Sequence, residues 1–68
     1  GGKEGMDFYR RIIPESKNYL KEEGLLIFEI GYHQAKDVSH IMIENGFKDI
    51  KILKDLQGLD RAVLGING

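Results

Sequence analysis

The chain has 68 residues, so it forms one small domain at most, and its formal net charge of -1 at pH 7 argues against general nucleic-acid binding, which requires a cationic surface. It contains no cysteine, which excludes a disulfide framework and a thiolate metal site and is compatible with a reducing, cytoplasmic setting. Its longest apolar run covers residues 25–28, far short of the ~20 residues that cross a bilayer, so we expect no membrane segment.

Residues 7–20 carry the apolar spacing that predicts an amphipathic helix. The apolar positions are Tyr9, Ile12, Ile13, Tyr19 and Leu20. Asp7 is placed to cap the start of this helix by accepting a backbone N–H. Pro14 has no N–H to donate and predicts a kink or a restart within the helix. Gly24 is then expected to close the segment in a left-handed conformation.

Residues 25–30 form a short apolar run interrupted only by Glu29, and Gly31 ends it. Such a run is typical of a strand that is covered on both faces. Residues 33–45 carry the next helical stripe of apolar side chains. The stripe consists of Ala35, Val38, Ile41 and Met42. Gly46 predicts the end of this helix because glycine adopts positive φ at little cost.

Residues 49–53 and 61–66 are the last two predicted strands, and the short connection between them allows antiparallel pairing. The first two strands are joined by a helix, so the right-handed crossover rule makes them parallel to each other. Two crossovers in the same direction also place both helices on one face of the sheet. The other face is expected to be bare.

Four segments follow one another along nearly the whole chain. They are Gly1-Gly2-Lys3-Glu4-Gly5-Met6-Asp7-Phe8-Tyr9-Arg10, Glu29-Ile30-Gly31-Tyr32-His33-Gln34, Asn45-Gly46-Phe47 and Asp55-Leu56-Gln57-Gly58-Leu59-Asp60-Arg61. In order and spacing they resemble the Gly-Gly-x-x-Gly-Leu-Asp-Phe-Tyr, Glu-Ile-Gly-x-x-Gln, Gly-Phe and Asp-Leu-x-Gly-x-Asp-Arg segments of HemK-type protein-glutamine N5-methyltransferases. The set is specific to that family.

The resemblance implies an α/β, Rossmann-like class I methyltransferase that uses S-adenosylmethionine and methylates the glutamine of the Gly-Gly-Gln motif in peptide-chain release factors. This chain would be the C-terminal third of that domain. We expect an αβαββ order and a three-stranded mixed sheet with the last strand in the middle and both helices on one face.

The family's glycine-rich donor loop and its Asn-Pro-Pro-Tyr motif do not occur in this sequence. We therefore expect the isolated fragment to bind no cofactor and to transfer no methyl group. The alternative is a stand-alone αβαββ protein-interaction module without catalysis.

Five residues are candidates for the edge that faces the substrate. They are Glu29, Gly31, Gln34, Asp60 and Arg61. Ligands of open α/β folds gather at the carboxyl ends of parallel strands, where the first strand ends and the last loop emerges. The alternative for these residues is structural: Glu29 and Gln34 tie down neighbouring backbone, and an Asp–Arg pair closes the loop.

Other features do not predict a site. His33 and His40 are seven residues apart, about 10.5 Å along a helix, which is too far to share one zinc ion. The glycines at the start of the chain precede a helix, but no strand precedes them, so a flexible segment is favoured over a phosphate cradle.

The bare face and the unpaired edge of the first strand predict self-association. Residues 25–28 and 62–64 are apolar on both faces of the sheet. Exposed apolar patches and hydrophobic edge strands favour pairing with another chain. A core this small also barely offsets the ordering entropy of the chain. We expect the fragment to form a homodimer through that face or that edge.

Overall fold

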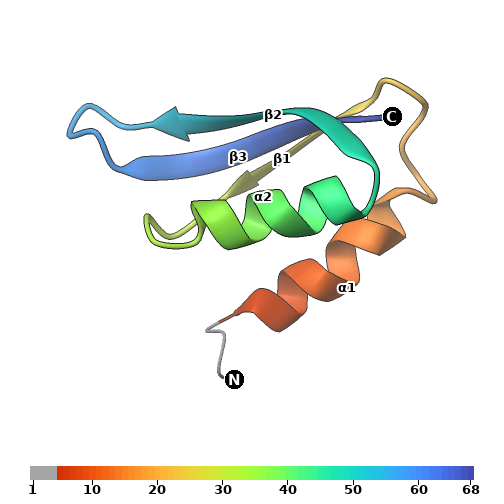
Figure 1. Cartoon of the computed structure of the whole chain (residues 1–68), viewed down its shortest axis with the longest axis horizontal. Helices are drawn as coiled ribbons and strands as arrows, with labels where there is room; N and C mark the ends of the chain where they lie inside the picture. Colours follow the sequence, from red (N-terminus) through yellow and green to blue (C-terminus); the bar gives the residue numbers. More distant parts are fainter. Residues whose placement is uncertain (1–4) are drawn as a thin grey trace.

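The computed structural model describes residues 5–68. The flexible segment predicted at Gly1 and Gly2 lies outside this range. The elements, in chain order, are α1 (Met6–Ser16), β1 (Leu25–Glu29), α2 (Ala35–Glu44), β2 (Phe47–Lys54) and β3 (Asp60–Asn67). The strand order is β1-β3-β2, so the prediction of an αβαββ order with the last strand in the middle is confirmed (Figure 1). β3 is antiparallel to both neighbours. The described sheet is therefore purely antiparallel, and the prediction of a mixed sheet is wrong, because β3 separates β1 and β2, which run in the same direction without pairing.

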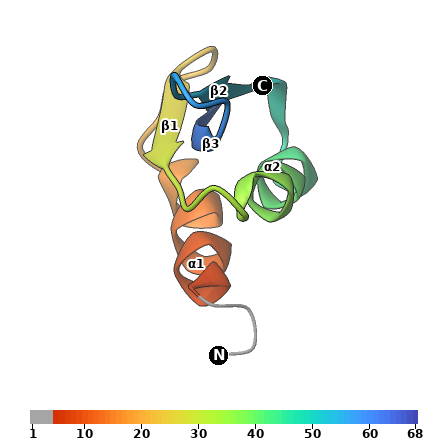
Figure 2. The ribbon, with the colours of Figure 1, turned by 90° about the vertical axis from the view of Figure 1, so that its left-hand side faces the viewer.

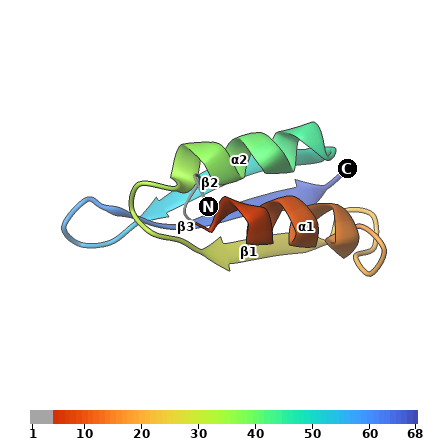
Figure 3. The same cartoon turned by 90° about the horizontal axis from the view of Figure 1, so that it is seen from below.

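Both helices lie on the same face of the sheet, as predicted, which Figure 2 and Figure 3 show from two sides. α2 contacts β2 and β3, and α1 contacts α2. Tyr9 joins α1 to β1, because its ring meets the ring of Phe28 edge to face at 5.3 Å between centroids. The fold thus has two layers, with one face of the sheet left open.

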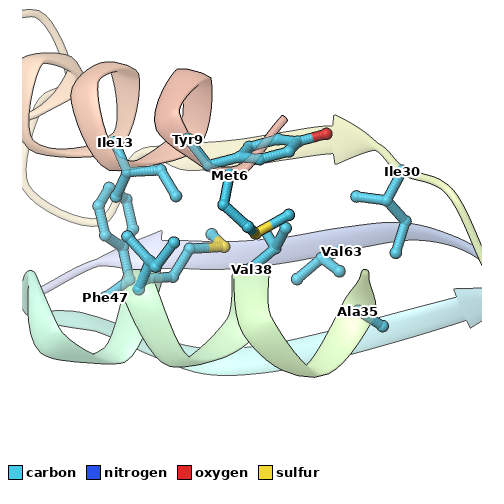
Figure 4. Packing of buried hydrophobic residues seen from close by; sticks show 10 residues of the cluster. Met6, Tyr9, Ile13, Ile30, Ala35, Val38, Phe47 and Val63 are labelled. Carbon is cyan, nitrogen blue, oxygen red and sulfur yellow. The ribbon is translucent and has the colours of Figure 1, made fainter. Parts of the chain in front are cut away.

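The hydrophobic core fills the space between the two helices and the sheet (Figure 4). Its buried members are Met6, Tyr9, Ile13, Ile30, Ala35, Val38, Ile41, Met42, Phe47 and Val63. All four residues of the predicted stripe on α2 are among them. The helical period of the sequence therefore located the inner face of α2.

α1 begins and ends differently from the prediction. Gly5, with φ of 84°, precedes it, and Asp7 lies within the first turn without capping the helix, since no side-chain hydrogen bond caps it. The helix passes through Pro14 but stops at Ser16 rather than at residue 20. The N–H groups of residues 17–19 bind carbonyls three positions back, which is the tighter 3₁₀ pattern. Ser16 also donates its hydroxyl to the Ile13 carbonyl at 2.6 Å.

The connection from α1 to β1 is held by a residue at the far end of the chain. Its left-handed residue is Glu23, with φ of 69°, and not Gly24 as predicted. Gly24 is needed for space instead, because a Cβ there would lie 2.9 Å from the Lys21 carbonyl oxygen. The buried Asn67 donates its side-chain amide to the carbonyls of Leu20 and Lys21 at 3.2 and 3.0 Å.

Gly46 adopts the predicted positive φ, at 88°, and β2 begins directly after it, two residues earlier than predicted. Asp49 has φ of 54°, and the register of β2 against β3 shifts between Lys48 and Lys51. Opposite this bulge, Gly65 of β3 makes room for the core. A Cβ on Gly65 would lie 2.6 Å from Ile50 Cδ1 and 2.8 Å from Met42 Cε.

The outer face of the sheet is bare, as predicted. Leu25 and Ile27 of β1 are 54% and 50% exposed, and Leu53 of β2 is 44% exposed. The expectation that the first strand is covered on both faces is therefore wrong for the described chain. Within residues 5–68, no helix is long and apolar enough to cross a membrane.

Candidate substrate-facing edge

The candidate residues lie at one end of the sheet, where β1 and β2 end and β3 begins (Figure 1). Three of them belong to the end of β1 and the turn before α2: Glu29, Gly31 and Gln34. The other two, Asp60 and Arg61, open β3. The strand register brings the two groups together, because Glu29 pairs with Ala62 and the Ile30 N–H donates to the Arg61 carbonyl at 3.0 Å.

Glu29 and Arg61 line a small hollow of about 190 Å³ together with Ile30. Both charged side chains are exposed. A carboxylate accepts hydrogen bonds and a guanidinium donates them, so this pair suits a polar group that does both, such as an amide. The hollow is smaller than the ~300–1,000 Å³ of a typical small-molecule site, which favours contact with a protein surface.

Gln34 fixes the turn between β1 and α2. Its side-chain Oε1 accepts the backbone N–H of Gly31 at 2.8 Å. The backbone N–H of Gln34 donates to the Gly31 carbonyl at 2.9 Å. A Cβ on Gly31 would lie 3.3 Å from the ring of His33 and 3.4 Å from Gln34 Oε1, so glycine fits this tight turn best. Gln34 therefore ties down neighbouring backbone, which was the structural alternative for this residue. A direct contact of Gln34 with substrate stays a prediction.

The backbone of Glu29, rather than its carboxylate, is held by the fold. Its carbonyl accepts the hydroxyl of Tyr9 at 3.3 Å. Burial raises the pKa of Tyr9, in the direction that favours the protonated hydroxyl, the form that donates this hydrogen bond. The Glu29 side chain is exposed at the end of β1, so the desolvation cost expected for a carboxylate on a buried strand does not arise. Its carboxylate is accessible to a partner.

Asp55 organises the loop between β2 and β3. Its Oδ1 accepts the N–H groups of Gln57 and Leu59 at 2.8 and 3.0 Å, and its Oδ2 lies 3.3 Å from Arg61 Nε. These hydrogen bonds, that of Leu59 foremost, and the Arg61 charge hold the pKa of Asp55 below its usual range. The Asp–Arg closure of the loop is thus present, with Asp55 as its acid. Asp60 pairs with Lys54 instead.

Two features of this loop were missed among the candidate residues. Asp55 lies within the resembled segment, three positions before Gly58, and aspartate side chains commonly close turns onto the backbone, so the signal was available. Leu56 is fully exposed at the loop, beside the Arg61 end of the sheet. No periodicity marks a single apolar residue in a loop, so only the structure identifies it as an accessible contact.

The histidines make local contacts. His33 packs its ring against Tyr32 at 5.3 Å, and His40 Nε2 lies 3.1 Å from Glu44 Oε2 on the exposed side of α2. In the described part of the chain, no three His, Cys, Asp or Glu side chains are grouped in a way that could hold a metal ion.

Comparison with known proteins identifies relatives of this chain. No family model matches the sequence, and no solved structure matches it. The release factor glutamine methyltransferase of Clostridium botulinum is 51% identical over 63 residues, which cover 93% of this chain and 22% of the relative. The protein of the same name from Clostridium acetobutylicum is 47% identical over 68 residues, covering 100% of this chain and 24% of the relative. That from Thermodesulfovibrio yellowstonii is 44% identical over 64 residues, covering 94% and 23%.

The chain spans less than a quarter of the length of these curated relatives. The similarity is continuous over nearly all of this chain, and it agrees with the resemblance of the four sequence segments. This chain is therefore a homologue of one segment of the release factor glutamine methyltransferases, as its sequence predicted.

Proposed function

We propose that this chain is the C-terminal segment of a release factor glutamine methyltransferase. The whole protein would act in the cytoplasm, transferring the methyl group of S-adenosylmethionine to the glutamine side-chain amide of a peptide-chain release factor. The observation that carries the proposal is 47% identity over all 68 residues to a relative of that name.

The role we assign to this segment is to hold the rim of the substrate site. Transfer of a methyl group to an amide depends mainly on positioning the nitrogen against the donor methyl. Two loops at the candidate edge are fixed internally, one by Gln34 and the other by Asp55. Glu29 and Arg61 are exposed beside these fixed loops. They are suited to orient a protein substrate without taking part in the chemistry.

The 68-residue chain alone is expected to transfer no methyl group, because the family's donor loop and Asn-Pro-Pro-Tyr motif are not in its sequence. Calorimetric titration of the chain with S-adenosylmethionine tests this directly. A saturable site with micromolar affinity would contradict the assignment of the donor site to another part of the protein.

The upstream reading frame separates the proposal from a stand-alone interaction module. We expect it to encode a glycine-rich strand–loop–helix followed by an Asn-Pro-Pro-Tyr motif. A frame without these features would leave the module as the better assignment.

The proposed rim is tested in the protein encoded by the whole reading frame. Arg61→Ala is expected to lower kcat/KM for a release factor about 5- to 10-fold, since one lost charged contact at a rim is worth about 1 kcal/mol. Arg11→Ala is the matched control, because Arg11 is exposed on α1 and outside the candidate edge. Equal effects of the two substitutions would refute the rim.

A further inference from the structure

The side-chain amide of Gln34 faces two segments that are far apart in the sequence. Its Oε1 accepts the backbone N–H of Gly31 at 2.8 Å. Because an oxygen must occupy that position, the orientation of the amide is fixed and its nitrogen points the other way. The nitrogen lies against Gly5, since a Cβ on Gly5 would be 3.6 Å from Gln34 Nε2, an ordinary van der Waals distance. One side chain thus contacts both the turn after β1 and the residue that precedes α1. We call these two contacts the Gln34 bridge.

The backbone of Gln34 is itself held in place. Gln34 is the residue before α2, and its carbonyl accepts the Val38 N–H at 3.0 Å. Its own backbone N–H donates to the Gly31 carbonyl. The first turn of α2 is anchored in the core by the buried side chains of Ala35 and Val38. The position of the Gln34 side chain is therefore set by the core of the fold.

Gly5 is the residue through which the chain enters α1. Its φ is 84°, a conformation that a side chain would strain, and its carbonyl accepts the Phe8 N–H at 3.2 Å in the first turn of the helix. The helix itself is held to the end of β1 by Tyr9, whose hydroxyl donates to the Glu29 carbonyl. The start of α1 and the end of β1 consequently lie at the same end of the molecule (Figure 3). Gln34 adds a contact with the residue just before the helix.

We propose that Gln34 is a positioning residue for the methyl transfer: the Gln34 bridge fixes the turn after β1 and the entry of α1 relative to each other, at the candidate edge. This inference rests on the proposed function. The upstream part of the whole protein is expected to carry the Asn-Pro-Pro-Tyr motif, and it joins α1 through Gly5. The bridge would then fix that upstream part relative to the rim formed by Glu29 and Arg61. This role acts through the backbone and needs no contact of Gln34 with donor or substrate.

The reaction is sensitive to such a restraint because its rate depends on placing the amide nitrogen against the donor methyl. A misplacement of about 1 Å can cost about 100-fold in rate, even when its cause is far from the reacting atoms. The two residues that the bridge contacts are both glycines, which restrict the backbone less than any other residue. Gly5 is needed for its positive φ, and Gly31 for a turn that a Cβ would crowd. The side chain of Gln34 supplies the restraint that these glycines lack.

Hydrogen exchange tests the bridge without an assay of activity, in the protein encoded by the whole reading frame. Gln34→Ala is expected to speed exchange of the Gly31 and Phe8 amides about 3- to 10-fold each, the effect of one lost hydrogen bond. Gln57→Ala is the matched control, because Gln57 is exposed in the loop between β2 and β3, and it is expected to change neither amide. Faster exchange at Gly31 with no change at Phe8 would overturn the proposal, since Gln34 would then serve the turn alone.

Steady-state kinetics test what the bridge does for the reaction. Gln34→Ala is expected to lower kcat for a release factor about 10- to 100-fold, with an unchanged KM for S-adenosylmethionine, because the donor is bound by another part of the protein. A kcat equal to that of Gln57→Ala would overturn the proposal and leave the proposed function standing. If the unmodified protein methylates no release factor, the proposed function fails, and hydrogen exchange still decides whether the bridge exists.

Gln34→Glu separates the two contacts and replaces Gln34→Ala if that variant does not fold. Its carboxylate offers an oxygen to the Gly31 N–H but has no N–H to direct toward Gly5. The Gly31 amide is therefore expected to stay protected, while the Phe8 amide exchanges faster and kcat remains about 10-fold or more below that of the unmodified protein. Unchanged Phe8 exchange together with an unchanged kcat would overturn the proposal.

Discussion

Removal of the Asn67 side chain is expected to weaken the whole fold, because this residue joins the end of β3 to the connection between α1 and β1. Its amide donates two hydrogen bonds, to the carbonyls of Leu20 and Lys21. Each contributes about 1 kcal/mol net, so Asn67→Ala removes about 2 kcal/mol. The buried Oδ1 has no partner among the described residues, and its removal returns part of this loss. We expect a net destabilisation of about 1–2 kcal/mol.

A loss of this size is large for so short a chain. Stability of about 0.05–0.15 kcal/mol per residue corresponds to about 3–10 kcal/mol in total, and each kcal/mol shifts Tm by about 4–8 °C in a domain of this size. Urea unfolding followed by circular dichroism, at one fixed protein concentration, measures the change. Asn67→Asp is expected to be worse than Asn67→Ala, because it keeps the shape but directs a carboxylate at two carbonyl oxygens.

Asn18→Ala is the control for this experiment, because Asn18 is exposed in the same connection. Its substitution is expected to change stability by less than about 0.5 kcal/mol. Equal midpoints for Asn67→Ala and Asn18→Ala would show that the contact from β3 does not hold the connection, and would refute the reasoning.

Gly65→Ala is expected to destabilise the folded chain by about 1–3 kcal/mol, because the new Cβ would overlap two core side chains. A urea midpoint equal to that of the unmodified chain would contradict the close packing. Tyr9→Phe removes one hydroxyl hydrogen bond of 3.3 Å and is expected to cost about 0.5 kcal/mol in the same assay; a larger loss would mean that the hydroxyl does more than hold the Glu29 carbonyl. Because the folded-state pKa of Asp55 is lowered, its carboxylate stabilises the folded chain above its ordinary pKa, and this contribution is lost as pH falls through the lowered pKa. Asp55→Asn is therefore expected to be less stable at pH 7 and to lose less stability on acidification. Unfolding midpoints at a series of pH values check this. An equal fall of the midpoint with decreasing pH in the two proteins would contradict it.

The parts of the candidate edge that could be predicted from sequence are those set by topology. A strand followed by a crossover helix and an antiparallel hairpin brings Glu29 and Arg61 to one end of the sheet, whatever the side chains do there. The contacts of these residues were not predictable in the same way. Which acid pairs with Arg61 depends on loop geometry, and the structure pairs it with Asp55 and not with its neighbour Asp60.

The sequence by itself determined the order of the elements, the inner face of α2, the turn at Gly46 and the homology to release factor glutamine methyltransferases. These depend on a residue and its near neighbours, through helical period, positive φ at glycine and the order of short segments along the chain.

Only the tertiary structure decided where α1 ends and how its connection to β1 is held. The α1–β1 connection depends on Asn67, which reaches carbonyls 46 and 47 residues away. The bulge at Asp49 likewise depends on how β2 pairs with β3. Contacts of this kind arise when strands distant in sequence pair in one register, and a local pattern carries no information about the partner that register brings.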